Sequence, residues 1–344
     1  MKVFGLGRYA LLVCISIAVL AACSSGGSQV PIGVPGAIPQ TSASVTYAAH
    51  GKSWMTPGAQ RQPNLLYISN WGTGDVTVYT YLDGSGLVLV GTLTGFSSPT
   101  GLCTDKAGNV WITDYDTRKI FEYAHGGTTP IFKITEFKAF PYACAVDPTT
   151  GNLAVSNQHP NAKFAPHGDV KVYPKGRRPG RIYSTSGGFG DVYFVTYDNK
   201  SNLYVDGTPC AYSYCSDGGG GPGLYRLAKG GSAFKRLTLK GAALYQPVAI
   251  NWINPTLLLG DRNFANQGTS GAYKLLVSGS TATVVNALHF NGTQQTNGLW
   301  RRAEHVIVPD YTGSIVRIYN LSDGTLFSTM TTGISLPFAA VVSQ

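Results

Sequence analysis

Glutamate and histidine are scarce in this chain. Only three Glu (Glu122, Glu136 and Glu304) and six His occur among 344 residues, and charged residues make up 12% of the sequence. General acid–base catalysis depends on carboxylates and imidazoles placed close together. No carboxylate–histidine grouping recurs along the chain. The sequence therefore does not favour an enzyme that works by acid–base chemistry, and no residue is predicted to be catalytic.

Helical periodicity is missing after residue 22, and no apolar run reaches the roughly 20 residues that a membrane-spanning helix needs. What the chain has instead is 43% apolar residues, 43 Gly and 20 Tyr. Short alternating segments between Gly, Asn and Asp turns are typical of β-strands and hairpins. We expect an all-β protein with ample material for a core.

The first 22 residues resemble an export signal. Lys2 and Arg8 precede an apolar run over residues 9–20, which ends in the tetrapeptide LAAC. This tetrapeptide resembles the lipobox of bacterial lipoproteins, so we expect cleavage before Cys23 and a lipid on its sulfur. The alternative is an ordinary signal peptide that happens to contain a cysteine. The predicted location is the bacterial cell envelope, lipid-anchored and extracytoplasmic, on the periplasmic side or at the surface.

Residues 23–63 are rich in Ser, Gly and Pro and lack strand periodicity, so we expect a flexible tether after the signal at 1–22. From residue 64 onward one strand pattern recurs six times. Four mainly apolar or small residues are closed by Asp, Asn or Gly, in LYISN, VWITD, LAVSN, LYVDG, LLLGD and VIVPD, which end at residues 70, 114, 157, 207, 261 and 310. A further strand follows each copy. Repeats of this length predict a six-bladed β-propeller over residues 64–344.

The two ends of the repeat region complement each other. The first unit has no innermost strand before it, whereas the chain ends in PFAAVVSQ (residues 337–344), an innermost strand with nothing after it. Pairing these segments would close the ring and remove an exposed sheet edge. We expect the C-terminal strand to close the propeller.

The clearest unit resembles NHL-repeat propellers. Its segments PTGLCTD (99–105) and GNVWITD (108–114) follow the pattern P-x-G-hydrophobic, then Asp, then Gly-Asn-hydrophobic, then Asp. Residues 141–157 follow it almost as closely. The resemblance implies a scaffold, and this fold supports many functions, so the function must be argued from the site.

Four cysteines remain after the export signal, as expected for disulfides in an oxidising compartment. Cys103 and Cys144 lie on innermost strands of adjacent units with opposite parity, so they can face each other across the boundary. Cys210 and Cys215 lie four residues apart in a long loop, which they could staple. Free thiols or a metal site lacking nearby ligands are the alternatives for that pair.

The formal charge of +9 falls to +7 when Lys2 and Arg8 leave with the signal. Much of it lies in one predicted hairpin, with Lys171, Lys175, Arg177, Arg178 and Arg181. The simplest interpretation is a solvated hairpin. The alternative is contact with anionic lipid or a cell-envelope polymer. Nucleic acid is not expected as a partner of an exported lipoprotein, and we expect a monomer.

The long loops of units three to five and the connections between units should emerge on one face of the ring. Functional residues concentrate on such loops. The candidate ligand-binding residues on this face are Tyr142, His159, His167, Phe189, Tyr193, Tyr245, Gln246, Arg262, Asn297 and Trp300. Some of these aromatic rings could instead simply fill the channel.

Aromatic and amide side chains with few charges suit sugars or polypeptides. The sequence therefore favours a non-catalytic binding module for a glycan, a peptide or an envelope protein, with no cofactor. A second hypothesis is a metal-dependent enzyme resembling streptogramin-type lyases or gluconolactonase-like lactonases, with a divalent metal in the channel. A third is a structural spacer of the envelope.

Overall fold

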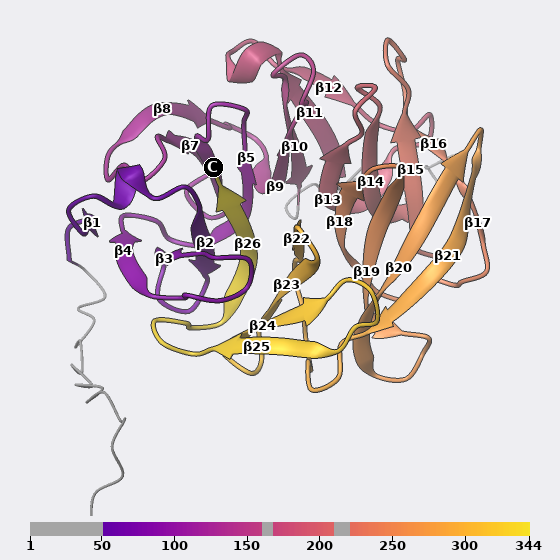
Figure 1. Ribbon diagram of the computed structural model, residues 1–344. Helices are drawn as coiled ribbons and strands as arrows, with labels where there is room; N and C mark the ends of the chain where they lie inside the picture. Colours follow the sequence, from indigo (N-terminus) through magenta and orange to yellow (C-terminus); the bar gives the residue numbers. More distant parts are fainter. Residues whose placement is uncertain (1–50, 160–167, 210–220) are drawn as a thin grey trace, which may run out of the picture. The chain divides into compact units, whose positions relative to one another are not determined.

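A computed structural model describes residues 51–159, 168–209 and 221–344 (Figure 1). The predicted signal peptide and Cys23, together with His167, Cys210 and Cys215, lie outside these residues. In the described part of the chain, regular structure consists of strands and two single-turn helices, η1 (Ala59–Arg61) and η2 (Pro174–Gly176). None of its helices has the length and apolar character needed to cross a membrane.

The second unit shows how the sequence produces the repeated sheet. Strands β5 (Pro99–Thr104), β6 (Val110–Asp114), β7 (Lys119–Tyr123) and β8 (Pro130–Thr135) pair antiparallel in that order. Between β5 and β6, Gly108 adopts a left-handed conformation with φ of 79°, which glycine tolerates without steric cost. Asp105 fixes the same turn, because its Oδ1 accepts the N–H groups of Ala107 and Asn109, both at 2.9 Å.

The other units repeat this order, from an innermost strand outward. The third unit has β9 (Phe140–Val146), β10 (Leu153–Gln158), β11 (Gly168–Tyr173) and β12 (Arg181–Tyr183). The fourth has β13 (Phe189–Tyr197), β14 (Leu203–Pro209), β15 (Gly223–Leu227) and β16 (Lys235–Arg236). The fifth has β18 (Pro247–Ile253), β19 (Thr256–Phe264), β20 (Thr269–Ser278) and β21 (Thr281–His289), with β17 (Thr238–Lys240) parallel to β21 at its edge. The last has β22 (Trp300–Arg302), β23 (His305–Asp310), β24 (Ile315–Asn320) and β25 (Leu326–Met330).

The first sheet joins the two ends of the repeat region. Strands β2 (Leu65–Asn70), β3 (Asp75–Thr80) and β4 (Leu89–Leu93) are completed by β26 (Pro337–Ser343), which pairs antiparallel with β2 from Leu65–Ser343 to Asn70–Pro337. The predicted pairing of the C-terminal strand with the first strand is confirmed. The predicted extent of the tether, residues 23–63, was wrong, because β1 (Trp54–Met55) pairs with β4 and covers the outer edge of this sheet.

The innermost strands form a closed series of contacts: β26 with β5, β5 with β9, β9 with β13, β13 with β18, β18 with β22, and β22 with β26. Figure 1 shows the sheets following one another around a common centre, as in a β-propeller. When sheets are defined by hydrogen bonding alone, the described strands form five sheets. The third and fourth units count as one sheet because a single residue pair, Gly168 and Phe189, joins them. Apolar side chains from facing sheets form the core between them.

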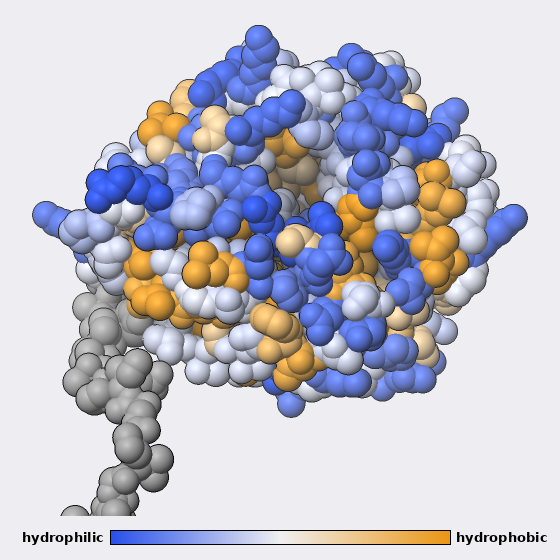
Figure 2. All heavy atoms as spheres, viewed as in Figure 1, coloured by the Kyte–Doolittle hydropathy of each residue, from blue (hydrophilic) through white to orange (hydrophobic). Residues whose placement is uncertain are grey.

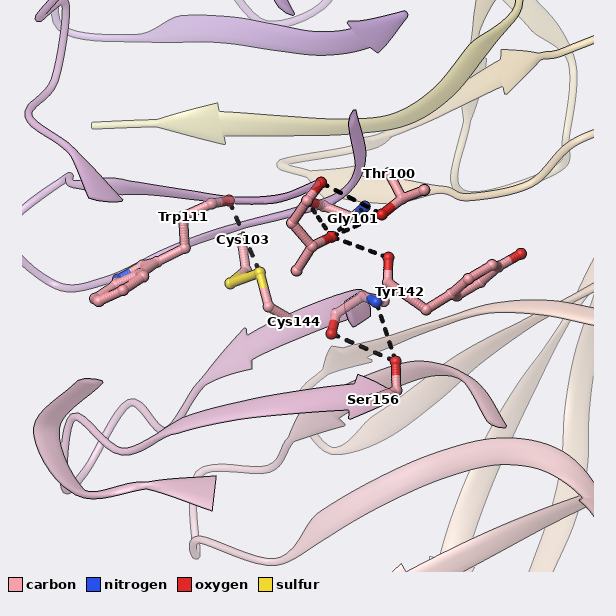
Figure 3. The surroundings of a disulfide bond; sticks show 9 residues. Thr100, Gly101, Cys103, Trp111, Tyr142, Cys144 and Ser156 are labelled. Carbon is pink, nitrogen blue, oxygen red and sulfur yellow. Dashed lines mark hydrogen bonds between the residues drawn. A yellow bond between two sulfur atoms is a disulfide. The ribbon is translucent and has the colours of Figure 1, made fainter. Parts of the chain in front are cut away.

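The disulfide between Cys103 on β5 and Cys144 on β9 is present, with a Cα–Cα distance of 5.7 Å. It confirms the prediction from strand parity. Both residues are buried in a cluster with Trp111, Ile134 and Tyr173. Figure 3 shows the bond joining two adjacent sheets, while the ring of Tyr142 points away from it.

Candidate functional site

Aspartates at the ends of second strands hold the connections that form one face of the propeller. Asp261 accepts the backbone N–H groups of Tyr245 (2.8 Å) and Gln246 (2.9 Å). Asp114 and Asp310 accept equivalent pairs of N–H groups in their own units, from Ser97 and Ser98 and from Gln294 and Gln295. Carboxylates that accept several backbone N–H groups fix the chain locally. These recurring Asp residues therefore position the face.

A pocket of about 300 Å³ opens where the third, fourth and fifth units meet. Five of the predicted residues line it: Tyr142, Tyr193, Tyr245, Gln246 and Arg262. Tyr142 comes from β9, Tyr193 from β13 and Arg262 from β19, so three separate sheets contribute. The pocket is polar and aromatic in character. A larger hollow of about 440 Å³ beside β16 and β17 is lined mainly by aliphatic residues and backbone.

The floor of the pocket is built from packed aromatic rings. Tyr142 meets Tyr193 edge to face, with ring centroids 6.0 Å apart, and also packs edge to face on Phe194 (5.7 Å) and Phe338 (5.2 Å). Such edge-to-face pairs fix ring orientation. Burial raises the pKa of Tyr193 to about 12 and raises the pKa of Tyr142 as well. Both phenols therefore remain neutral hydrogen-bonding groups at physiological pH.

Arg262 supplies the positive charge of the pocket. It is half-buried, its Nε donates to the carbonyl of Thr296 at 3.2 Å, and its Nη2 donates to the side-chain oxygen of Asn297. Both acceptors are neutral. In the described part of the chain, no carboxylate forms an ion pair with Arg262. The guanidinium is thus oriented by the protein but its charge is not neutralised.

The other predicted residues lie elsewhere. Phe189 is fully buried against Tyr225 and Phe234, so its assignment to the ligand-binding face is corrected to the core. Trp300 is half-buried between two core clusters and does not line the pocket. Asn297 is buried and touches the site only through Arg262.

The side chain of His159 bonds to neighbouring parts of its own unit. Its Nε2 lies 2.8 Å from Asp169 and its Nδ1 lies 3.0 Å from the carbonyl oxygen of Lys138. The hydrogen bond to Asp169 raises the pKa of His159. Among residues 51–159, 168–209 and 221–344, no group of three or more His, Cys, Asp or Glu is placed to hold a metal ion. His159 links β10 and β11 to the preceding connection.

In the first three units a hydroxyl lies one residue before the Asn or Asp that closes the repeated second-strand pattern, and it ties the unit to the next one. In each case it reaches a carbonyl oxygen on the next innermost strand. The hydroxyls belong to Ser69, Thr113 and Ser156, and the carbonyls to Thr100, Tyr142 and Tyr193, at 2.6, 3.0 and 2.5 Å respectively.

Asp206 occupies the same place in the fourth unit and was not recognised from the sequence. Its Oδ1 accepts the N–H of Phe194 at 2.6 Å, whereas its Oδ2 is buried with no hydrogen-bond partner among the residues that the structure describes. Burial raises the pKa of this carboxyl to about 7. A protonated Asp206 could donate as the serine and threonine hydroxyls do, and an ionised one could not.

This arrangement predicts a pH-dependent contribution to stability. The pKa of Asp206 is higher in the folded state than the ordinary 3.8. Its stabilising effect is therefore complete below about pH 4 and is lost as the pH rises towards 7, with a slope of about 1.4 kcal/mol per pH unit. Replacing Asp206 by serine, as in the third unit, should remove this slope. Denaturant unfolding at several pH values should show Asp206→Ser gaining stability relative to the wild type from pH 4 to pH 7. Parallel curves would contradict the assignment.

The comparisons with known proteins establish the fold. No family model matches the sequence. A stretch of the chain is similar to part of peptidyl-glycine alpha-amidating monooxygenase A of Xenopus laevis, at 34% identity over 85 residues. That match spans 21% of this chain and only 9% of the monooxygenase.

Solved structures resemble most of the chain. A chain of the nidogen/laminin complex matches with a TM-score of 0.61 and 14% identity, covering 82% of this chain and 98% of that one. A gluconolactonase from Xanthomonas campestris matches with a TM-score of 0.52 and 14% identity, covering 83% and 86%. A protein of unknown function from Bacteroides caccae matches with a TM-score of 0.55 and 12% identity, covering 82% and 99%. At such identities the likeness shows an all-β propeller and nothing of its function.

Proposed function

We propose that this protein is a non-catalytic binding module whose pocket takes an acidic glycan or peptide. The observation on which the proposal rests is Arg262, the one charged side chain among the described residues that line the pocket. Its two acceptors, the backbone carbonyl of Thr296 and the side-chain oxygen of Asn297, are both neutral, and no carboxylate of the described residues pairs with it, so an incoming carboxylate could supply an ionic partner. An arginine held in this way forms strong, directional hydrogen bonds to carboxylates.

The tyrosines complete the site. Tyr193, which is half-buried, and Tyr245, which is exposed, line the pocket beside Arg262, and Gln246 adds an amide. Rigid aromatic surfaces with a few placed polar groups suit sugar rings and extended peptides. The pocket is large enough for one or two sugar units or residues, so the ligand would extend across the face beyond it.

The test is an array of oligosaccharides and short peptides that differ in whether they carry a carboxylate. We expect the wild type to bind preferentially to the acidic members. The Arg262→Gln variant, which keeps hydrogen bonds but loses the charge, should bind them at least about tenfold more weakly, corresponding to about 1.4 kcal/mol. Lys240→Gln on the exposed edge strand β17 serves as the charge-matched control and should behave as wild type. Preferential binding to neutral members, or an Arg262→Gln variant with unchanged binding, would contradict the proposal.

A lactonase remains the second candidate. It is favoured by two solved neighbours, the gluconolactonase from Xanthomonas campestris and a putative gluconolactonase with a TM-score of 0.51 and 15% identity. Hydrolysis of glucono-lactone by the purified protein, dependent on an added divalent metal and lost on chelation, would replace the binding module with this enzyme.

We also propose a six-bladed ring of the NHL type that acts outside the cytoplasm, anchored through a lipid on Cys23. The closed series of six innermost strands supports the blade count. The LAAC tetrapeptide supports the anchor. The disulfide between Cys103 and Cys144 supports an oxidising compartment, where such bonds form and persist.

A further inference from the structure

A basic and apolar surface lies on the outer rim of the propeller, between β8 and β12, and shares no residue with the pocket. It consists of Phe137, Lys138, Arg178 and Ile182, here called the rim patch. Ile182 lies opposite Lys171 in the β11–β12 pair, and Lys171 in turn contacts Glu136, the residue before Phe137. Phe137 is 70% exposed and Ile182 is 59% exposed, and both cations are exposed. In Figure 2 the upper part of the view, over β8, η2 and β12, is mostly blue with orange side chains beside β8. Exposed apolar side chains among cations indicate a surface that meets a partner.

The acidic side chains of this region are already paired. Glu122 accepts from Arg177 at 2.9 Å, and Glu136 accepts from Lys171 at 3.0 Å. Both carboxylates are buried. Within the described residues, no ion pair involves Lys138 or Arg178. The rim patch therefore presents positive charge that the protein itself does not neutralise.

The hairpin between β11 and β12, which carries Arg177 and Arg178, is fastened to the neighbouring unit. The guanidinium of Arg177 lies 4.1 Å from the ring centroid of Phe132 on β8. Arg178 donates to the carbonyl of Thr135 at 3.3 Å, and its guanidinium lies 5.4 Å from the centroid of Phe137. Cation–π contacts and hydrogen bonds of this kind hold the hairpin against β8. The cations and the exposed Phe137 are thus presented together on a preformed surface.

We propose that the rim patch docks on the surface of an anionic lipid bilayer. Anionic headgroups complement the cations, and the boundary between headgroups and acyl chains accepts Phe137 and Ile182. A soluble polyanion would neutralise the cations but would leave these two apolar side chains in water. A bilayer satisfies both halves of the patch. This inference does not depend on the ligand of the pocket.

The test uses the compact unit Tyr47–Gln344, which contains every described element and the ring-closing pair of β2 and β26. Sedimentation with vesicles should show binding to mixtures of phosphatidylglycerol and phosphatidylcholine and little binding to phosphatidylcholine alone. Two double variants remove one half of the patch each: Lys138→Glu with Arg178→Glu, and Phe137→Ser with Ile182→Ser. Each should lower the vesicle-bound fraction at least about tenfold, because charge and apolar insertion both contribute.

Matched controls lie on other edges of the propeller. Lys235→Glu with Lys240→Glu changes two exposed cations, and Val285→Ser with Leu326→Ser changes two exposed apolar residues. Both controls should bind vesicles as the wild type does, and all variants should keep its melting temperature. Equal wild-type binding to both vesicle types, or unchanged binding of the patch variants, would overturn the proposal. So would a loss confined to the charge variant, because Phe137 and Ile182 would then take no part in binding to the bilayer.

Discussion

A protein truncated after Leu336 is expected to lose its native fold and aggregate. The deletion removes β26, the innermost strand of the first sheet, and leaves one edge of β2 unpaired from Leu65 to Asn70, while β3 still pairs with the other edge. It also removes Phe338, Val341 and Val342, each at most 5% exposed. Burying such side chains contributes about 1.5–3 kcal/mol each. Their sum is comparable to the whole stability of a typical domain.

Circular dichroism, melting temperature and size-exclusion chromatography of the truncated protein would check this expectation. The exposed edge of β2 should promote association. A synthetic peptide spanning residues 335–344 provides the control, since it can supply the missing strand in trans and should restore solubility. A soluble monomeric truncation with an unchanged melting temperature would show that β26 does not close the ring.

Removing the disulfide is expected to have the second largest effect. The bond between Cys103 and Cys144 closes a loop with a sequence separation of 41. By the chain-entropy model, such a cross-link stabilises the folded state by roughly 4 kcal/mol. The Cys103→Ala, Cys144→Ala double variant should therefore unfold at a much lower denaturant concentration than the oxidised wild type.

The reduced wild type is the internal control for the disulfide. It keeps both sulfur atoms in the buried cluster around Trp111 and loses only the covalent bond. If chain entropy is the cause, reduction alone should produce most of the loss seen in the double variant. Equal unfolding midpoints for oxidised wild type and double variant would show that the bond contributes nothing.

Features set by strand periodicity were predictable from the sequence. The spacing of the repeated strands indicated a propeller, the unmatched ends indicated the pairing of β26 with β2, and parity placed Cys103 opposite Cys144. The first two predictions needed only the order and spacing of the repeated strands, and the third needed only the alternation of side chains along a strand. The short edge strands β1 and β17 could not be predicted, because two or three residues show no periodicity.

Individual site residues were less predictable because β-bulges interrupt the alternation. In β13 the register shifts between Phe189 and Val192 and again between Val192 and Val195. Phe189 consequently enters the core while Tyr193 reaches the pocket. Bulges change the face to which a side chain points. Asp206 was missed because the sequence pattern aligned its neighbour Gly207 with the Asp residues that close the other strands. The position before that closing residue carries a hydroxyl in the first three units, and only the structure shows that this side chain bonds to the next unit.

The most direct test of the binding pocket is the crystal structure of the protein with the acidic ligand that binds most strongly on the array. We expect a carboxylate oxygen within hydrogen-bonding distance of the Arg262 guanidinium, and a sugar ring or peptide group against Tyr193 or Tyr245. A ligand bound elsewhere on the propeller, with this pocket empty, would contradict the proposed site.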